Sequence, residues 1–149
     1  MPLFFISVKT NVNYCVVGVF MPEHEDAASI KEAIDVFKSW NENWRPQDFI
    51  TDCCWAEINA IESAFEDVLV RLCKFHREKA WNEWLARSEN GIGENREMLK
   101  GLMRDIAEST TEAGFNWAYN ELQQSNIWKV NPKLRRWFQN SWLSEKSDG

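Results

Sequence analysis

The 149-residue sequence lacks a long apolar run, an excess of basic residues and a disulfide framework. A membrane-spanning helix needs about 20 consecutive apolar residues. No run in this chain approaches that length, so no membrane partner is expected. The N-terminus has no basic region before its apolar stretch, which argues against a signal peptide. The net charge of −6 argues against strong DNA binding by this chain alone, because such binding depends on neutralising phosphates.

The cysteines are few and poorly placed for pairing. They are Cys15, Cys53, Cys54 and Cys73, and the adjacency of Cys53 and Cys54 strains any intramolecular disulfide. An intracellular protein with reduced thiols is therefore expected.

Apolar and aromatic residues are abundant. The sequence is 44% apolar and 27% charged, which is typical of a globular protein, and its length suits one domain with a real core. Nine Trp and nine Phe predict a bulky aromatic core with tryptophans on helix faces.

The N-terminal half alternates between strand and helix patterns. Apolar runs predict strands at 3–8 and 14–20, which should form a hairpin, and Gly18 marks a bulge or a close approach. Ser29 and Glu32 have the spacing of a capping box for a helix that runs to Trp40. A strand at 49–51, a helix at 55–65, a strand at 68–72 and a helix at 75–87 follow.

The C-terminal half has only helical patterns. Residues 88–95, which include two glycines, have the composition of a linker, and three apolar stripes beyond them predict three helices. The predicted fold class is therefore α/β, with an α/β part at 1–90 and a helical part at 91–149.

Three chemically distinctive residues follow predicted strands. Asp52 ends the strand at 49–51, while Cys73 and His76 form a Cys-x-x-His motif after the strand at 68–72. The carboxyl ends of neighbouring parallel strands meet at one edge of a sheet, where ligands bind. We therefore expect Asp52, Cys73 and His76 to share one crevice.

The same residues carry a resemblance to a family. The segments FITDCCWAEINAIESAF and VLVRLCKFHREKAWNEWL resemble the catalytic core of Mutator-like element (MULE) DNA transposases, in which a strand ending in Thr-Asp precedes a helix and a strand that runs into Cys-x-x-His. PLFFISVKTNVNYCVVGVF, KSWNENWRPQDFITD and SNIWKVNPKLRRWF are similar to this group as well. The resemblance implies a ribonuclease H-like fold with a helical insertion, DNA as the partner, a nuclear location, and a carboxylate triad that binds two Mg²⁺ or Mn²⁺ ions.

Only Asp52 matches that triad. The family's first catalytic Asp and last catalytic Glu have no counterpart in this sequence, so we expect no DNA transposition activity, and no firmly held metal, from this chain alone. The family's first strand, which lies between the hairpin and the Asp52 strand, is also unmatched. The sheet should then have a gap or a new pairing, and its uncovered edge predicts self-association.

Each candidate residue also has a structural interpretation. Asp52 is a suitable metal ligand and also a suitable helix N-cap. Glu57 either faces the crevice or is a solvated residue of the first helical turn. Cys73 and His76 are half of a zinc site, for which Cys53 and Cys54 are the candidate partners, but a buried thiol and a hydrogen-bonded histidine are favoured over zinc.

A basic segment near the C-terminus completes the candidates. Lys129, Lys133, Arg135 and Arg136 lie beside Trp128 and Trp137, a combination that suits DNA contact. A helix with a solvated basic face and an aromatic core stripe is the favoured alternative. Three functions therefore stay open: an inactive portion of a MULE-type transposase, a transposase-derived module that binds protein or DNA without catalysis, and a small zinc protein.

Overall fold

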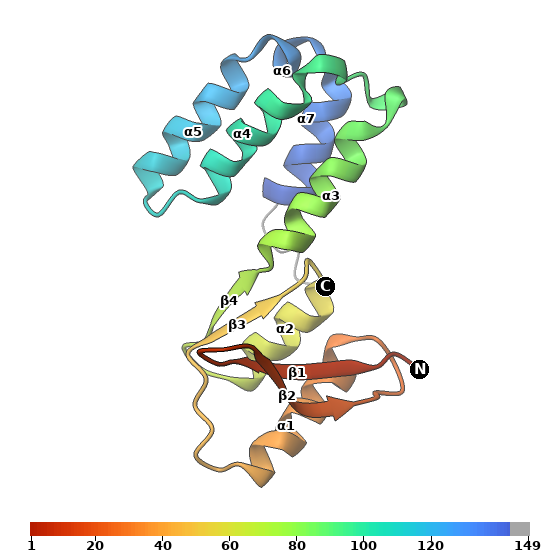
Figure 1. Cartoon of the computed structure of the whole chain (residues 1–149), viewed down its shortest axis with the longest axis vertical. Coiled ribbons are helices and arrows are strands. Elements are labelled where there is room, and N and C mark those ends of the chain that lie inside the picture. The colour runs from red at the N-terminus through yellow and green to blue at the C-terminus, as the bar shows by residue number, and fades with distance from the viewer. Residues whose placement is uncertain (144–149) are drawn as a thin grey trace. The chain divides into compact units, whose positions relative to one another are not determined.

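The computed structural model describes residues 1–143 and divides the chain into two compact units (Figure 1). The first unit, Met1–Arg77, contains strands and helices, and the second begins at Glu78 and is helical. The α/β fold class is therefore confirmed. The division falls inside helix α3 (Lys74–Ala86) and not near residue 90, because Trp81 and Leu85 of α3 are buried in the core of the second unit. None of the helices in residues 1–143 is long and apolar enough to cross a membrane.

The first unit begins with the predicted hairpin. Strands β1 (Phe4–Lys9) and β2 (Tyr14–Phe20) pair antiparallel, with a register shift between Ile6 and Ser7. Gly18 is a close approach, as expected. A Cβ at this position would lie 2.8 Å from the Phe37 ring, so only glycine lets helix α1 pack this tightly on β2.

Two helices cover one side of the strands. Helix α1 (Ala27–Trp40) begins one turn earlier than the capping-box prediction, because Asp26 and not Ser29 is its N-cap. The Ser29 N–H donates to Asp26 Oδ1 at 2.8 Å, so the expected cap is in fact the donor. Helix α2 (Trp55–Ala64) packs against α1, and the Lys38 ammonium donates to the Ala64 carbonyl at its end.

The strand pair after α1 is parallel. Strands β3 (Asp48–Thr51) and β4 (Leu69–Leu72) align Asp48 with Leu69 and Thr51 with Leu72, and α2 is the crossover between them. Within residues 1–143 this pair and the hairpin are two separate sheets. The resemblance predicts either a gap in the sheet or a new pairing. Among these residues the gap is found, and the two sheets do not pair with each other.

The two sheets nevertheless share one core. Phe4 and Phe20 of the hairpin stack at 5.1 Å between ring centroids, and Phe49 and Val70 of the parallel pair join the same cluster. The buried centre of that cluster comes from the two helices and the residue after α2, and consists of Ile30, Ile34, Ala60, Ile61, Ala64 and Phe65. Each sheet therefore buries one face on α1 and α2 and turns the other face away from them.

The segment at 88–95 is packed, which corrects its interpretation as a linker. It forms two short 3₁₀ turns, Ser88–Asn90 and Gly93–Asn95, and Asn90 and Ile92 are buried. The Asn90 side chain donates to the Trp84 carbonyl at 2.6 Å, and Asn131 donates to the Asn90 carbonyl at 2.8 Å. These bonds satisfy buried polar groups and fix the segment against its neighbours.

The rest of the described chain is helical, as predicted, but it has one more helix than predicted. The helices are α4 (Arg96–Ala107), α5 (Glu112–Gln124), α6 (Asn126–Val130) and α7 (Pro132–Phe138), followed by a π-helical turn (Gln139–Leu143). The third predicted stripe, Leu134, Trp137 and Phe138, lies on α7, and the additional helix is α6. Asn131 separates the two helices and caps α7 ahead of Pro132. Proline lacks the N–H that would continue α6.

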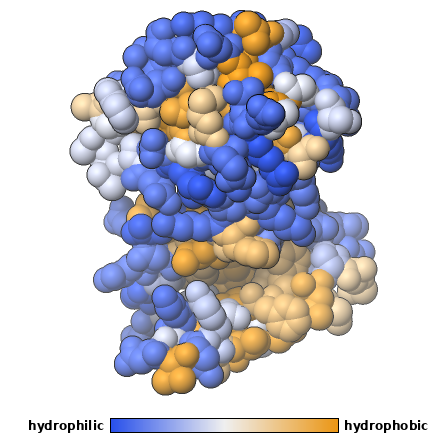
Figure 2. Space-filling view, turned by 45° about the horizontal axis from the view of Figure 1, so that its top comes forward, coloured by the Kyte–Doolittle hydropathy of each residue, from blue (hydrophilic) through white to orange (hydrophobic). Residues whose placement is uncertain are grey.

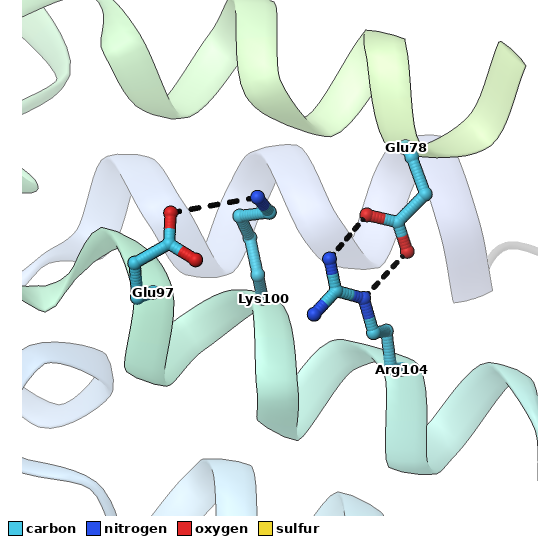
Figure 3. Close-up of polar contacts among 4 residues, drawn as sticks. All are labelled: Glu78, Glu97, Lys100 and Arg104. Atoms are coloured by element: carbon cyan, nitrogen blue, oxygen red, sulfur yellow. Dashed lines mark hydrogen bonds and ion pairs between the residues drawn. The ribbon is translucent and has the colours of Figure 1, made fainter. Parts of the chain in front are cut away.

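Aromatic and aliphatic side chains fill the core of this unit. Leu99, Met103, Leu122 and Leu134 are fully buried, and Trp84 stacks on Trp137 with 4.2 Å between ring centroids. The predicted helical stripes therefore face inward, except for Met98 of the first stripe, which is exposed. Charged pairs lie at the margin of this core (Figure 3), where Arg104 donates two hydrogen bonds to the Glu78 carboxylate, at 2.7 and 2.8 Å, and Lys100 Nζ lies 3.5 Å from Glu97.

Candidate functional site

The parallel pair brings Asp52 and Cys73 to the same edge of the sheet. Thr51 aligns with Leu72 in the register of β3 and β4, so the residue after each strand lies at the same end. The Cys73 N–H donates to the Thr51 carbonyl at 2.6 Å, which extends the pairing by one step. The predicted placement of these two residues is confirmed, while their functional role remains a prediction.

Asp52 does not cap the helix that follows it. The N-cap of α2 is Cys54, whose carbonyl accepts from the Ile58 N–H at 3.1 Å and whose side chain makes no capping bond. Asp52 lies two residues before this cap and is exposed. The N-cap interpretation is therefore wrong, and the carboxylate is available for another partner.

That partner is Glu57. This half-buried residue lies in the first turn of α2, and its side chain is hydrogen-bonded to the Asp52 carboxyl. Burial, followed by the negative charge of Asp52 and this hydrogen bond, raises the pKa of Glu57 to about 7. Glu57 therefore keeps its proton below neutral pH and faces Asp52, the less common of its two expected environments.

Cys54 joins the carboxyl pair. One ligand atom from each of Asp52, Cys54 and Glu57 lies within 4.8 Å of the other two. Neighbouring Cys53 is exposed as a residue, but nearby protein atoms partly desolvate its thiol. This desolvation, followed by the negative charges of Asp52 and Cys54, raises the pKa of Cys53. The sequence signal for this cluster is weak, because its residues span a helix start, where the direction of each side chain depends on which residue is the cap.

The fit of this cluster to divalent ions is partial. Asp52 and Glu57 offer the oxygen ligands that Mg²⁺ and Mn²⁺ prefer, whereas the Cys54 thiolate suits softer metals. A two-ion centre needs carboxylates that converge on both ions. Across residues 1–143 no other group of three His, Cys, Asp or Glu side chains has suitable geometry, so this cluster can hold one ion at most.

The Cys-x-x-His motif lies beside the cluster without joining it. Cys73 is half-buried at the end of β4, and His76 is exposed in the first turn of α3 with its ring 5.5 Å from that of Phe75. Cys53 and Cys54, its candidate zinc partners, do not form a three-ligand group with it in the described chain. The structure therefore brings Asp52 and Cys73 to one edge but assembles no cluster around His76.

Two of the four predicted DNA-contact residues have structural partners. Lys133 donates to the Glu89 carbonyl at 3.0 Å, and the Arg135 guanidinium donates to the Trp128 and Lys129 carbonyls at the end of α6. Lys129 and Arg136 are exposed. Trp128 is buried, so this tryptophan belongs to the core and is not available to stack on a nucleic-acid base.

A hollow in the first unit lies apart from the cluster residues. It measures about 720 Å³ and is lined by the hairpin residues Ile6, Val8 and Val17 and by Trp40 and Trp44 around the end of α1. None of the candidate residues lines it. The hollow and the Asp52–Cys54–Glu57 cluster are therefore different candidate sites. The cluster is the stronger candidate because it offers carboxyl and thiol groups.

Comparison of the chain with family models, curated proteins and solved structures finds no match.

Proposed function

We propose that this chain is a portion of a Mutator-like transposase catalytic domain with a ribonuclease H-like core, and that Asp52 is one of its metal-binding carboxylates. The observation that carries the proposal is the shared edge of β3 and β4, where Asp52 and Cys73 follow adjacent parallel strands. This arrangement agrees with the strand–Asp–helix–strand–Cys-x-x-His pattern in the sequence. The interrupted sheet is also consistent with a core that lacks one strand.

The described residues supply only part of the chemistry. In a two-ion mechanism the bound ions stabilise the attacking and leaving oxygens of the phosphodiester. In this proposal Asp52 would bind one ion, and Glu57 would assist only after losing its proton, because its pKa is about 7. The second ion requires carboxylates that this sequence does not contain, so transposition would need a longer or an assembled protein.

A non-catalytic role in DNA binding has less support. Lys133 and Arg135 are engaged with backbone carbonyls, and the chain carries 23 acidic residues against 17 basic residues. Lys129 and Arg136 therefore remain as predicted DNA contacts without a surrounding basic surface. A zinc protein also lacks a complete ligand set in residues 1–143.

A nicking assay tests the proposed function. The purified chain is incubated with a labelled supercoiled duplex and Mg²⁺ or Mn²⁺, alongside the Asp52→Ala variant and an Asp67→Asn control at an exposed turn. We expect no nicking from the three proteins. We also expect cleavage that depends on Asp52 from a longer protein that includes both of the family's missing carboxylates. Nicking by the 149-residue chain that is lost in Asp52→Ala would contradict the requirement for added carboxylates, and inactivity of the longer protein would contradict the transposase assignment.

A further inference from the structure

The outer face of the first unit is apolar and exposed. Six large side chains on this face are from 49% to 66% exposed, and we define the outer face by them: Phe5, Tyr14, Val16, Val19, Ile50 and Leu69. Figure 2 shows apolar residues on the surface of this unit. We propose that the outer face is the interface of a two-fold symmetric dimer of this chain, an inference that does not rest on the proposed function.

Strand register places each of the six residues on the face of its own sheet that is opposite the core. In the hairpin, Phe5 pairs with Val19 and both are exposed, whereas the neighbouring pair Phe4 and Phe20 packs toward the helices. In the parallel pair, Ile50 is exposed between Phe49 and the buried Thr51. Because both sheets pack on α1 and α2, the opposite faces of both sheets point away from those helices.

The charge on this face favours an identical partner over a nucleic acid or an anionic membrane. Residues 1–22 contain no acidic residue and only one basic residue, Lys9. The charged groups beside Ile50 are Asp48 and Arg71, which neutralise each other at 3.1 Å. A phosphate-rich partner would find almost no positive charge here. Two copies of the outer face would meet with little like-charge repulsion, although the whole chain has a net charge of −6.

The exposed area matches the needs of a stable dimer. From the exposed fractions, the six side chains present about 700 Å² of mainly apolar surface, near the ~800 Å² per partner of a standard interface. A two-fold axis would place the same patch on both sides of the interface and would close the assembly at two copies.

Sedimentation analysis of the full chain tests the dimer. We expect a mass of about 35 kDa, twice the 17.5 kDa of the chain, that falls to the monomer mass on dilution from submillimolar to micromolar concentration. The double variant Phe5→Lys/Val19→Lys places like charges across the axis and should raise the dimer dissociation constant at least ~100-fold. The milder Phe5→Ser should weaken the dimer in the same direction and serves if the double variant does not fold.

A matched control comes from the second unit. Val130 is 74% exposed, so Val130→Lys adds a charge at an equally accessible apolar position and should leave the dimer intact. A monomer throughout the concentration range would overturn the proposal. So would a dimer that survives in a folded Phe5→Lys/Val19→Lys variant, or one that Val130→Lys weakens equally. A mass that keeps rising above the dimer would also overturn it, because it would indicate open-ended pairing of strand edges.

Discussion

Replacement of Glu57 by Gln should stabilise the first unit at alkaline pH and have little effect under acidic conditions. The Glu57 pKa rises from 4.5 to about 7 on folding, so the fold favours the protonated carboxyl. Folding loses stability from this group as the pH rises from 4.5 through 7, because the folded protein must then bury a charge or retain a proton. Glutamine carries no charge, and its amide can still donate to the Asp52 carboxylate.

The size of this effect follows from the shift and from the exposure of the pair. A shift of about 2.5 pKa units corresponds to about 3 kcal/mol in a fully buried site. Asp52 is exposed and Glu57 only half-buried, so solvent screening reduces the expected gain at pH 8 to about 1 kcal/mol. At pH 4 the expected difference between the two proteins is close to zero.

The difference is measured by urea unfolding at pH 4, 6 and 8. Hydrogen exchange of the α2 amides at the same pH values assigns it to the first unit. Glu66→Gln is the control, because Glu66 is an exposed residue just after α2. A gain for Glu57→Gln that is equal at the three pH values, or a matching gain for Glu66→Gln, would refute the raised pKa of Glu57 beside Asp52.

Two further predictions concern packing. Gly18→Ala should destabilise the first unit by about 1–3 kcal/mol, because the added Cβ meets the Phe37 ring at 2.8 Å. Gly101→Ala in α4, where a Cβ meets nothing within 4 Å, should stabilise the chain by up to ~1 kcal/mol. Thermal melts that shift in the same direction for both glycine variants would contradict these assignments. Leu99→Ala should cost about 2–5 kcal/mol in chemical denaturation because Leu99 is fully buried. Met98→Ala next to it, at a side chain 46% exposed, should change stability by less than ~0.5 kcal/mol, so equal losses would mean that the buried face of α4 is assigned incorrectly.

Local patterns in the sequence were sufficient to predict most of the elements. The hairpin, β3 and β4 are short apolar runs bounded by polar residues, and the buried stripes of α4 and α5 have helical spacing. The shared edge of Asp52 and Cys73 could be predicted too, because a helix between two parallel strands leaves both carboxyl ends on one side.

Other features depend on contacts that a local pattern does not contain. Residues 88–95 have the glycines of a linker, but the Asn90 side chain reaches the Trp84 carbonyl and its own carbonyl accepts from Asn131. The start of α1 could not be located because Asp26 and Ser29 are both good caps, and the choice between them depends on the chain that leads into the helix.

The candidate site was predictable only in part, for a similar reason. Asp52 was identifiable from its place after a strand, but its neighbour Glu57 was not distinguishable from an ordinary first-turn glutamate. Their contact depends on Cys54 being the N-cap, which rotates α2 so that Glu57 faces back toward Asp52. The structural roles of Lys133 and Arg135 likewise depend on distant carbonyls, so composition alone predicted a DNA-contact surface there.

Paramagnetic line broadening by Mn²⁺ tests most directly whether the Asp52 edge binds metal. Amide signals of the full chain are recorded during a MnCl₂ titration, for the wild type, Asp52→Asn and Asp67→Asn. Asp67 is a suitable control because it is exposed and has a positive φ of 58°, a conformation that asparagine also tolerates. The account predicts weak, saturable broadening centred on residues 52–57 and 73, lost in Asp52→Asn and retained in Asp67→Asn. Broadening centred elsewhere, or unchanged in Asp52→Asn, would contradict it.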